Sequence, residues 1–176
     1  MSSSLRYSGA GPGAEASFTL GRFTAEGSYL SIQMDPTSGS GATESFRATE
    51  IDGRLRCEVT GYLGLEVGLT SRTTDSEFAA QSVGAASVGA RTQYLLGPEA
   101  LVWARGAYLA ASQFSGGGSA PLSFGLGVAI TLLRHVRVTA DYEFQKVGRE
   151  TEPGGSASVT APIEESHARL GVAAAF

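Results

Sequence analysis

The stretch Thr49-Glu50-Ile51-Asp52-Gly53-Arg54-Leu55-Arg56-Cys57-Glu58-Val59 decides the fold class of this chain. Every even position in it is charged, and every odd position except Thr49 is apolar or small. Successive side chains of a β-strand point to opposite faces, so this period of two predicts a strand with one apolar and one charged face. A helix would scatter the same charges around its surface.

The same alternation returns along the whole chain. Clear examples run from Leu63 to Leu69, from Leu122 to Leu132, from Val136 to Phe144 and from Ala168 to Phe176. The expected strands number ten and cover residues 3–9, 13–20, 22–34, 46–59, 62–73, 82–95, 100–112, 121–132, 136–147 and 165–176. The sequence has no helical segment and no sign of a second domain, so it predicts a single all-β domain over residues 1–176.

The connections between these segments alternate in length. Short turns are expected near Gly21 and at 60–61, 96–99 and 133–135, and longer polar loops at 35–45, 74–81, 112–120 and 148–164, with a modest loop at 9–13. Outer-membrane barrels show this asymmetry, with short periplasmic turns and longer outer loops. The pattern favours a closed antiparallel transmembrane barrel of ten strands with both termini at the turn end. If residues 1–20 form a plug or tail, the alternative is eight strands.

The polar face separates a membrane barrel from a soluble ligand-carrying barrel, whose apolar face would point inward. Its charges are mainly Arg, Asp and Glu, and Lys146 is the only lysine of the chain. Arginine forks can bridge carboxylates in a confined lumen. We therefore expect a lumen charge network made of Glu50, Asp52, Arg54, Arg56, Glu58, Glu66, Arg91, Arg105, Arg137, Asp141, Glu143 and Arg169.

Aromatic residues on the apolar face sort by depth. An aliphatic band separates those near the turn ends from those near the loop ends. Rings prefer the level of the lipid headgroups, so two aromatic girdles are expected in a membrane barrel. The expected lipid-facing residues are Phe18, Phe23, Tyr94 and Phe176 at the turn end, and Tyr7, Tyr29, Tyr108, Phe124, Tyr142 and Phe144 at the loop end.

The last segment alternates through Ala168, Leu170, Val172 and Ala174 to a terminal Phe176, and the first hairpin turns at 20–23. In these features the chain resembles the small outer-membrane β-barrels of Gram-negative bacteria, the OmpA-type superfamily. The resemblance implies a bacterial outer-membrane location, contact with outer-membrane lipid, and a C-terminal assembly signal at Phe176 that the barrel-assembly machinery reads. Such a protein is exported, and because Met-Ser-Ser-Ser lacks a leader pattern, we expect the leader to have been removed. The superfamily is functionally diverse, so the resemblance is specific for architecture alone.

Two places fit the alternation poorly. If Glu26 points inward, then Leu30 and Ile32 do too, and a bulge near the outer end of this strand would correct the mismatch. Trp103 shares a face with Arg105. Trp103 therefore either stacks on a lumen guanidinium or returns to the lower girdle through a bulge.

Candidate catalytic residues are few. A net charge of −4 gives no basic footprint for nucleic acid, and a single cysteine, Cys57, excludes an internal disulfide and a cysteine metal cluster. His135 is expected in a tight turn. His167 adjoins Ser166, but neighbours in a strand diverge, so a Ser-His-acid site is not expected. Asp141 and Glu143 are expected in salt bridges rather than in acid–base chemistry.

We therefore expect no enzyme activity, no cofactor and no metal. The leading hypothesis is a monomeric outer-membrane barrel with a structural or surface-interaction role, the latter through the loop 148–164. A narrow passive, porin-like pore for ions or small solutes is the first alternative, since inner-face glycines would leave space. A soluble ligand-binding barrel with inverted faces is the second.

Overall fold

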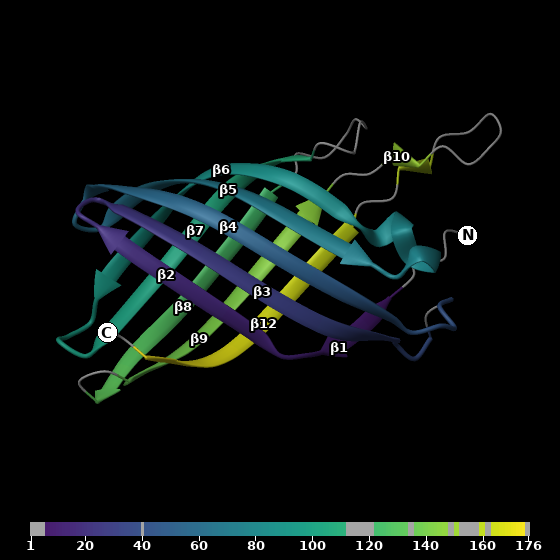
Figure 1. Ribbon diagram of the computed structural model, residues 1–176, viewed down its shortest axis with the longest axis horizontal. Coiled ribbons are helices and arrows are strands. Elements are labelled where there is room, and N and C mark those ends of the chain that lie inside the picture. Colours follow the sequence, from purple (N-terminus) through teal and green to yellow (C-terminus); the bar gives the residue numbers. More distant parts are fainter. Residues whose placement is uncertain are drawn as a thin grey trace.

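The computed structural model describes residues 6–39, 41–111, 122–133, 136–147, 150–151, 159–160 and 163–174. An antiparallel sheet of ten strands curls into an open half-barrel (Figure 1), which confirms the all-β fold class and the strand number. Its strands are β1 (Tyr7–Ala10), β2 (Gly13–Leu20), β3 (Phe23–Pro36), β4 (Phe46–Thr60), β5 (Leu63–Thr74), β6 (Val83–Leu95), β7 (Ala100–Ala111), β8 (Leu122–Leu133), β9 (Val136–Val147) and β12 (Ile163–Ala174). Separately, β10 (Glu150–Thr151) pairs with β11 (Val159–Thr160).

The first two strands share one position in the sheet. β2 pairs with the first part of β3, and β1 pairs with its last part, so both lie along the same neighbour. They are joined through Gly11 and Pro12, where a Cβ on Gly11 would lie 1.7 Å from the Ser31 carbonyl oxygen. Pro12 has no N–H to give to a ladder, so the strand is interrupted here without reversing. The prediction that residues 9–13 form a loop between two neighbouring strands is therefore wrong.

Because β1 and β2 share one position, the two edge strands of the sheet differ in relative direction from those of the expected ten-strand order. β1 and β2 stand at one edge and β12 at the other, eight antiparallel steps apart, so the two edge strands run in the same direction. β1 begins at the end of the half-barrel that carries the longer loops, and β12 ends at the opposite end (Figure 1). The expectation that both chain ends meet at the turn end is wrong for these strands. Among the described residues, no pairing joins β12 to β1 or β2.

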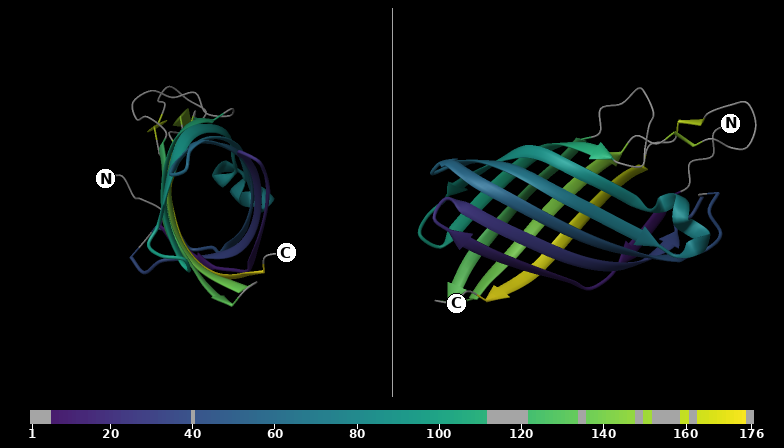
Figure 2. Two further views of the ribbon diagram at one scale, coloured as in Figure 1. Left: turned by 90° about the vertical axis from the view of Figure 1, so that its left-hand side faces the viewer. Right: turned by 45° about the horizontal axis from the view of Figure 1, so that its top comes forward.

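The predicted asymmetry of the connections is present. Tight turns at 21–22, 61–62 and 96–99 lie at one end, called here the turn end, and the segments 37–39, 41–45 and 75–82 lie at the other, the loop end. Gly21 has φ of 61°, a conformation that glycine adopts without strain in a hairpin turn. The 3₁₀ helix η1 (Ser76–Gln81) lies at the loop end of the curled sheet (Figure 2). In the part of the chain that the structure describes, no helix is long and apolar enough to cross a membrane.

The two faces of the sheet differ in burial as the period of two predicts. Along β4, Phe46, Ala48, Glu50, Asp52 and Arg56 are buried on the concave side, called here the inner face. The alternate residues Ile51 and Leu55 are 57% and 47% exposed on the convex, outer face. Away from the loop end, where Phe46 lies inside, the charged residues of β4 are therefore inside the half-barrel and its large apolar residues are outside.

The bulge expected in the strand after Gly21 is absent. β3 and β4 keep one register from the pair Phe23–Cys57 to the pair Met34–Phe46. Ile32 therefore stays on the inner face, where it is 8% exposed. Its side chain is accommodated because this end of the interior is apolar, with buried Phe46, Ala48, Val83, Ala85 and Leu109.

Aromatic rings extend this apolar end of the interior. Phe78 of η1 stacks on Phe46 with ring centroids 4.7 Å apart, and Tyr7 meets Phe46 edge-on at 4.9 Å. Tyr7 was expected in the lipid-facing girdle, and that prediction is wrong, because its ring packs on a residue of the inner face. Apolar and aromatic side chains therefore gather inside the loop end of the half-barrel.

Candidate functional site

The main chemical feature of the interior is a network of ion pairs. Glu50, Asp52, Arg56, Glu66, Arg105 and Glu143, all expected in the lumen, are 4–8% exposed. Arg54, Glu58, Arg91, Asp141 and Arg169 are partly buried, and each forms at least one ion pair. Arg137, near the turn end, is exposed and forms no ion pair with any described residue.

Glu143 on β9 is the centre of this network. Its Oε1 accepts hydrogen bonds from Arg105 Nη1 at 2.7 Å, from Arg54 Nη2 at 3.0 Å and from Ser123 Oγ at 3.3 Å. Its Oε2 accepts one from Arg169 Nη2 at 3.2 Å. These partners lie on β7, β4, β8 and β12, so one carboxylate connects strands on opposite sides of the half-barrel.

A second group of charges lies nearer the turn end. Glu26 Oε1 accepts hydrogen bonds from Arg56 Nη1 at 2.8 Å and from Arg91 Nη1 at 3.2 Å. Arg56 also donates to Glu58 at 2.8 Å. The guanidinium of Arg91 sits 4.5 Å above the centre of the Trp103 ring. This contact confirms the first of the two interpretations of Trp103, the one in which it stacks on a lumen guanidinium.

Two glycines of β8 make room for that ring. A Cβ on Gly127 would lie 2.6 Å from the Trp103 indole, and a Cβ on Gly125 would lie 3.0 Å from Arg105 Cγ. Both glycines are on the inner face, so their missing side chains let Trp103 and Arg105 fill the interior. These inner-face glycines therefore contribute to a filled interior rather than to an open channel.

Sequence reasoning missed a third group at the loop end. Arg72 Nη1 donates to Glu165 Oε2, and Glu165 Oε1 lies 2.8 Å from His167 Nε2. Glu50 lies beside them, since one of its carboxylate oxygens is within 4.8 Å of ligand atoms of both Glu165 and His167. The signal in the sequence was the spacing Glu165-x-His167, which places both side chains on one face of a strand.

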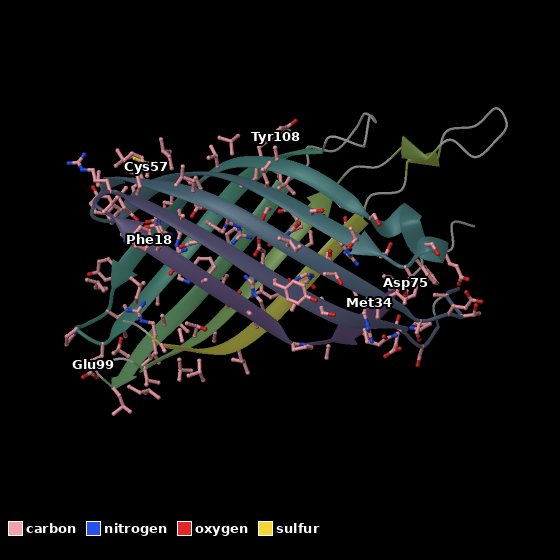
Figure 3. The ribbon with its side chains drawn as sticks, in the orientation of Figure 1. Phe18, Met34, Cys57, Asp75, Glu99 and Tyr108 are labelled. Carbon is pink, nitrogen blue, oxygen red and sulfur yellow. The ribbon has the colours of Figure 1, made fainter. Side chains whose placement is uncertain are left out.

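Apart from Tyr7, the described residues that were expected to face lipid lie on the outer face. Phe18, Phe23, Tyr29, Tyr94, Tyr108, Phe124 and Tyr142 are 41–68% exposed, and Phe144 is partly exposed. Figure 3 shows Tyr108 projecting from the outer side of the sheet, with Asp75 at the loop end and Glu99 at the turn end. Phe176, His135 and most of the loop 148–164 lie outside the described residues.

Comparison with known proteins does not place the chain in a family. No family model, no curated protein and no solved structure matches it. The resemblance to the OmpA-type superfamily therefore stays a prediction from the residue pattern.

Proposed function

We propose that this protein is an outer-membrane β-barrel of a Gram-negative bacterium, with a structural or surface-interaction role and no catalysis. The main support for this proposal is that the apolar face of the sheet is exposed and the charged face is buried. Leu170, Val172 and Leu69 are 87%, 77% and 69% exposed on the outer face, while Glu66 and Arg105 are each 5% exposed inside. A soluble ligand-binding barrel needs the opposite arrangement.

The outer face is more apolar than the water-exposed surface of a soluble monomer. Exposed large apolar side chains occur on every strand from β2 to β9 and on β12. Soluble monomers rarely expose contiguous apolar patches above a few hundred Å², and larger patches mark contact with a protein or a membrane. Lipid hydrocarbon would cover this surface at no desolvation cost, which makes outer-membrane lipid the proposed partner.

The strand lengths support the same proposal. β5, β7, β8, β9 and β12 each have 12 residues. Such a strand is roughly 40 Å long, and a tilt of about 40° projects it to roughly 30 Å, close to the thickness of the hydrocarbon core. In lipid the backbone groups at both sheet edges must also be paired. The proposed membrane form is therefore closed, and direct pairing of β12 with β1 and β2 would be parallel.

The filled interior supports a barrel that does not conduct. Ion pairs centred on Glu143 cross the half-barrel, and the rings of Phe46 and Phe78 stack at the loop end. The observation that favours the alternative, a narrow pore, is a small pocket among the charged residues, lined by Glu15, Glu26, Gly27, Ser28, Asp52 and Arg54. Its lining residues lie on the adjacent strands β2, β3 and β4, as expected for a gap in the network rather than a passage along the barrel.

A role without catalysis is supported by the positions of the candidate nucleophile and base. Ser166 is exposed on the outer face, whereas His167 is half-buried on the inner face. Their functional atoms therefore point to opposite sides of β12. The proposed interactions of the protein lie instead at the loop end and at the C-terminal strand, which the barrel-assembly machinery would bind.

Refolding tests this proposal. The chain is diluted from urea into detergent micelles or into plain buffer, and unboiled samples are compared with boiled ones on a gel. Folding in micelles alone, with a shifted unboiled band, is the expected result; a monodisperse folded protein in buffer would overturn the membrane proposal. Planar-bilayer recordings then separate the silent barrel that we expect from the pore, which would give discrete conductance steps.

A further inference from the structure

Three potential metal ligands converge inside the loop end of the half-barrel. Glu50 lies on β4, and Glu165 and His167 lie on β12. One carboxylate oxygen of each glutamate and one ring nitrogen of His167 all lie within 4.8 Å of one another. β4 and β12 are not neighbours in the sheet, so the curl of the sheet creates this cluster.

The donor atoms of this cluster have few partners among the described residues besides one another. Glu50 is 6% exposed, and its side chain forms no hydrogen bond or ion pair with any described residue. Glu165 Oε1 and His167 Nε2 form an ion pair at 2.8 Å, and both atoms are buried without another partner. Buried polar atoms are almost always paired in proteins, and a bound ion is one explanation for exceptions.

The charge around the cluster also favours a cation. Asp52 and Glu165 repel the carboxylate of Glu50, while Arg72 and His167 attract it. Arg72 donates to Glu165 Oε2 and thereby leaves Oε1 directed at His167. A histidine that binds a metal is neutral, so in the metal-binding form Glu50 and Glu165 carry two negative charges against the one positive charge of Arg72. The net negative charge of the buried group attracts a cation.

We propose that Glu50, Glu165 and His167 bind a divalent transition-metal ion of the zinc class. One imidazole nitrogen and two carboxylate oxygens form a donor set that zinc accepts, whereas Ca²⁺ and Mg²⁺ prefer oxygen ligands alone. Ligands of one zinc ion lie roughly 3.0–3.4 Å from each other, so the three side chains close around the ion through shifts of about 1 Å. Arg72 orients Glu165 from behind, as groups outside the ligand shell commonly do.

Bound metal would connect β4 to β12 across the interior. The site lies at the loop end, next to the apolar residues around Phe46, and Glu50 is two positions from the buried Ala48 on the same face of β4. The ion would therefore hold the two sides of the curled sheet together where the ion pairs of Glu143 do not reach. This inference is independent of the proposed membrane location, because it depends only on groups inside the fold.

Zinc binding to the folded protein tests the inference. The protein is folded in micelles or in buffer, as the refolding assay decides, treated with EDTA, and titrated with ZnCl₂ in a calorimeter. We expect a single ion per chain, no competition from excess Mg²⁺, and at least about a tenfold loss of affinity in His167→Gln and in Glu50→Gln. The matched control is His135→Gln, which removes the only other histidine of the chain and should leave zinc affinity unchanged.

Three results would overturn the inference: no stoichiometric zinc in the stripped wild-type protein, undiminished binding in His167→Gln, or a loss confined to His135→Gln. The first would mean that a proton rather than a metal neutralises Glu50. If the variants do not fold, a chemical-modification experiment on the wild-type protein still tests the inference. Zinc should protect His167, but not His135, from modification by diethyl pyrocarbonate, measured by mass spectrometry, and equal reactivity of His167 with and without zinc would refute the site.

Discussion

Glu143 is the residue on which the interior ion pairs converge, so its replacement has a defined consequence. Glu143→Gln keeps the size of the side chain but leaves Arg54, Arg105 and Arg169 without their shared carboxylate. Removing one partner from a buried ion pair destabilises a protein by about 3–5 kcal/mol when the remaining charge has no other partner. Each of the three arginines keeps a second carboxylate, so we expect a loss no larger than this. These carboxylates are Asp52, Glu66 and Asp141. We expect a clear fall in the urea concentration at which the folded, unboiled gel band disappears.

The control for Glu143 is Glu164→Gln. Glu164 pairs with Lys146 at 2.6 Å, but its side chain is 53% exposed, and exposed pairs contribute at most about 1 kcal/mol. The urea midpoint of this variant should stay close to that of the wild type. Equal shifts in the two variants would show that the interior is solvated enough to screen its charges.

Sequence reasoning at the residue scale predicted the inner charges but not their partners. Parity along a strand places Asp52 and Glu143 on the polar face of the sheet, and the many arginines among the charges of that face predicted it to be the inner one. The partner of a given charge depends on how tightly the sheet curls: Arg54 meets Glu143 across 89 positions of sequence, and Arg72 meets Glu165 across 93. No local pattern carries that information, which is why Arg72, Glu165 and His167 were missed as a group.

At the scale of elements, the packing of β8 beside β7 depends on Gly127. A Cβ at Gly127 would lie 2.6 Å from the Trp103 ring, which is itself held against Arg91. Gly127→Ala therefore forces the indole or the strand to move, and overpacking of this kind destabilises by about 1–3 kcal/mol. Urea midpoints of the folded band would measure the loss, and the fluorescence of Trp103 should shift with it.

Gly53→Ala is the matched control in another strand of the same sheet. Gly53 is exposed on the outer face of β4, and a Cβ there would meet nothing within 4 Å. Replacing this strand glycine should leave stability unchanged or raise it by up to about 1 kcal/mol, since the unfolded chain loses freedom. A loss in Gly53→Ala as large as that in Gly127→Ala would mean that strand glycines matter here for backbone reasons and not for space.

The elements that sequence reasoning misplaced share a cause. β1 and β2 were expected as neighbouring strands joined by a loop at 9–13, a segment that contains the turn residues Gly11 and Pro12. The structure uses the same residues to interrupt one edge strand, since β3 is long enough to pair with both segments. In β3, a bulge was expected because Ile32 shares a face with charged residues. The interior around Ile32 is apolar, so no bulge is needed. Turn chemistry and face polarity are local signals, and both were overridden by contacts with distant strands.

At the scale of the whole molecule, the proposal depends on which face meets lipid, and the single tryptophan of the chain can report it. Trp103 stacks on Arg91 inside the half-barrel, whereas Leu126 is 46% exposed on the outer face of β8. In vesicles of lipids with brominated acyl chains, which quench an indole in contact with hydrocarbon, we expect little quenching of Trp103. A Leu126→Trp change in a Trp103→Phe background should be quenched strongly, as its ring would replace an aliphatic residue of the apolar band.

The two probes together distinguish three arrangements of the molecule. Strong quenching at position 126 with weak quenching at position 103 is the result expected for a membrane barrel with a charged interior. Strong quenching at position 103 with weak quenching at position 126 would place the charged face against lipid. Exposing Glu66, Arg105 and Glu143 to hydrocarbon costs too much free energy for this fold. That result would therefore mean that the fold itself is different. Quenching at neither position would mean that the apolar outer face is covered by something other than lipid, such as a second copy of the chain, and the membrane proposal would then fail while the fold and its ion pairs would stand.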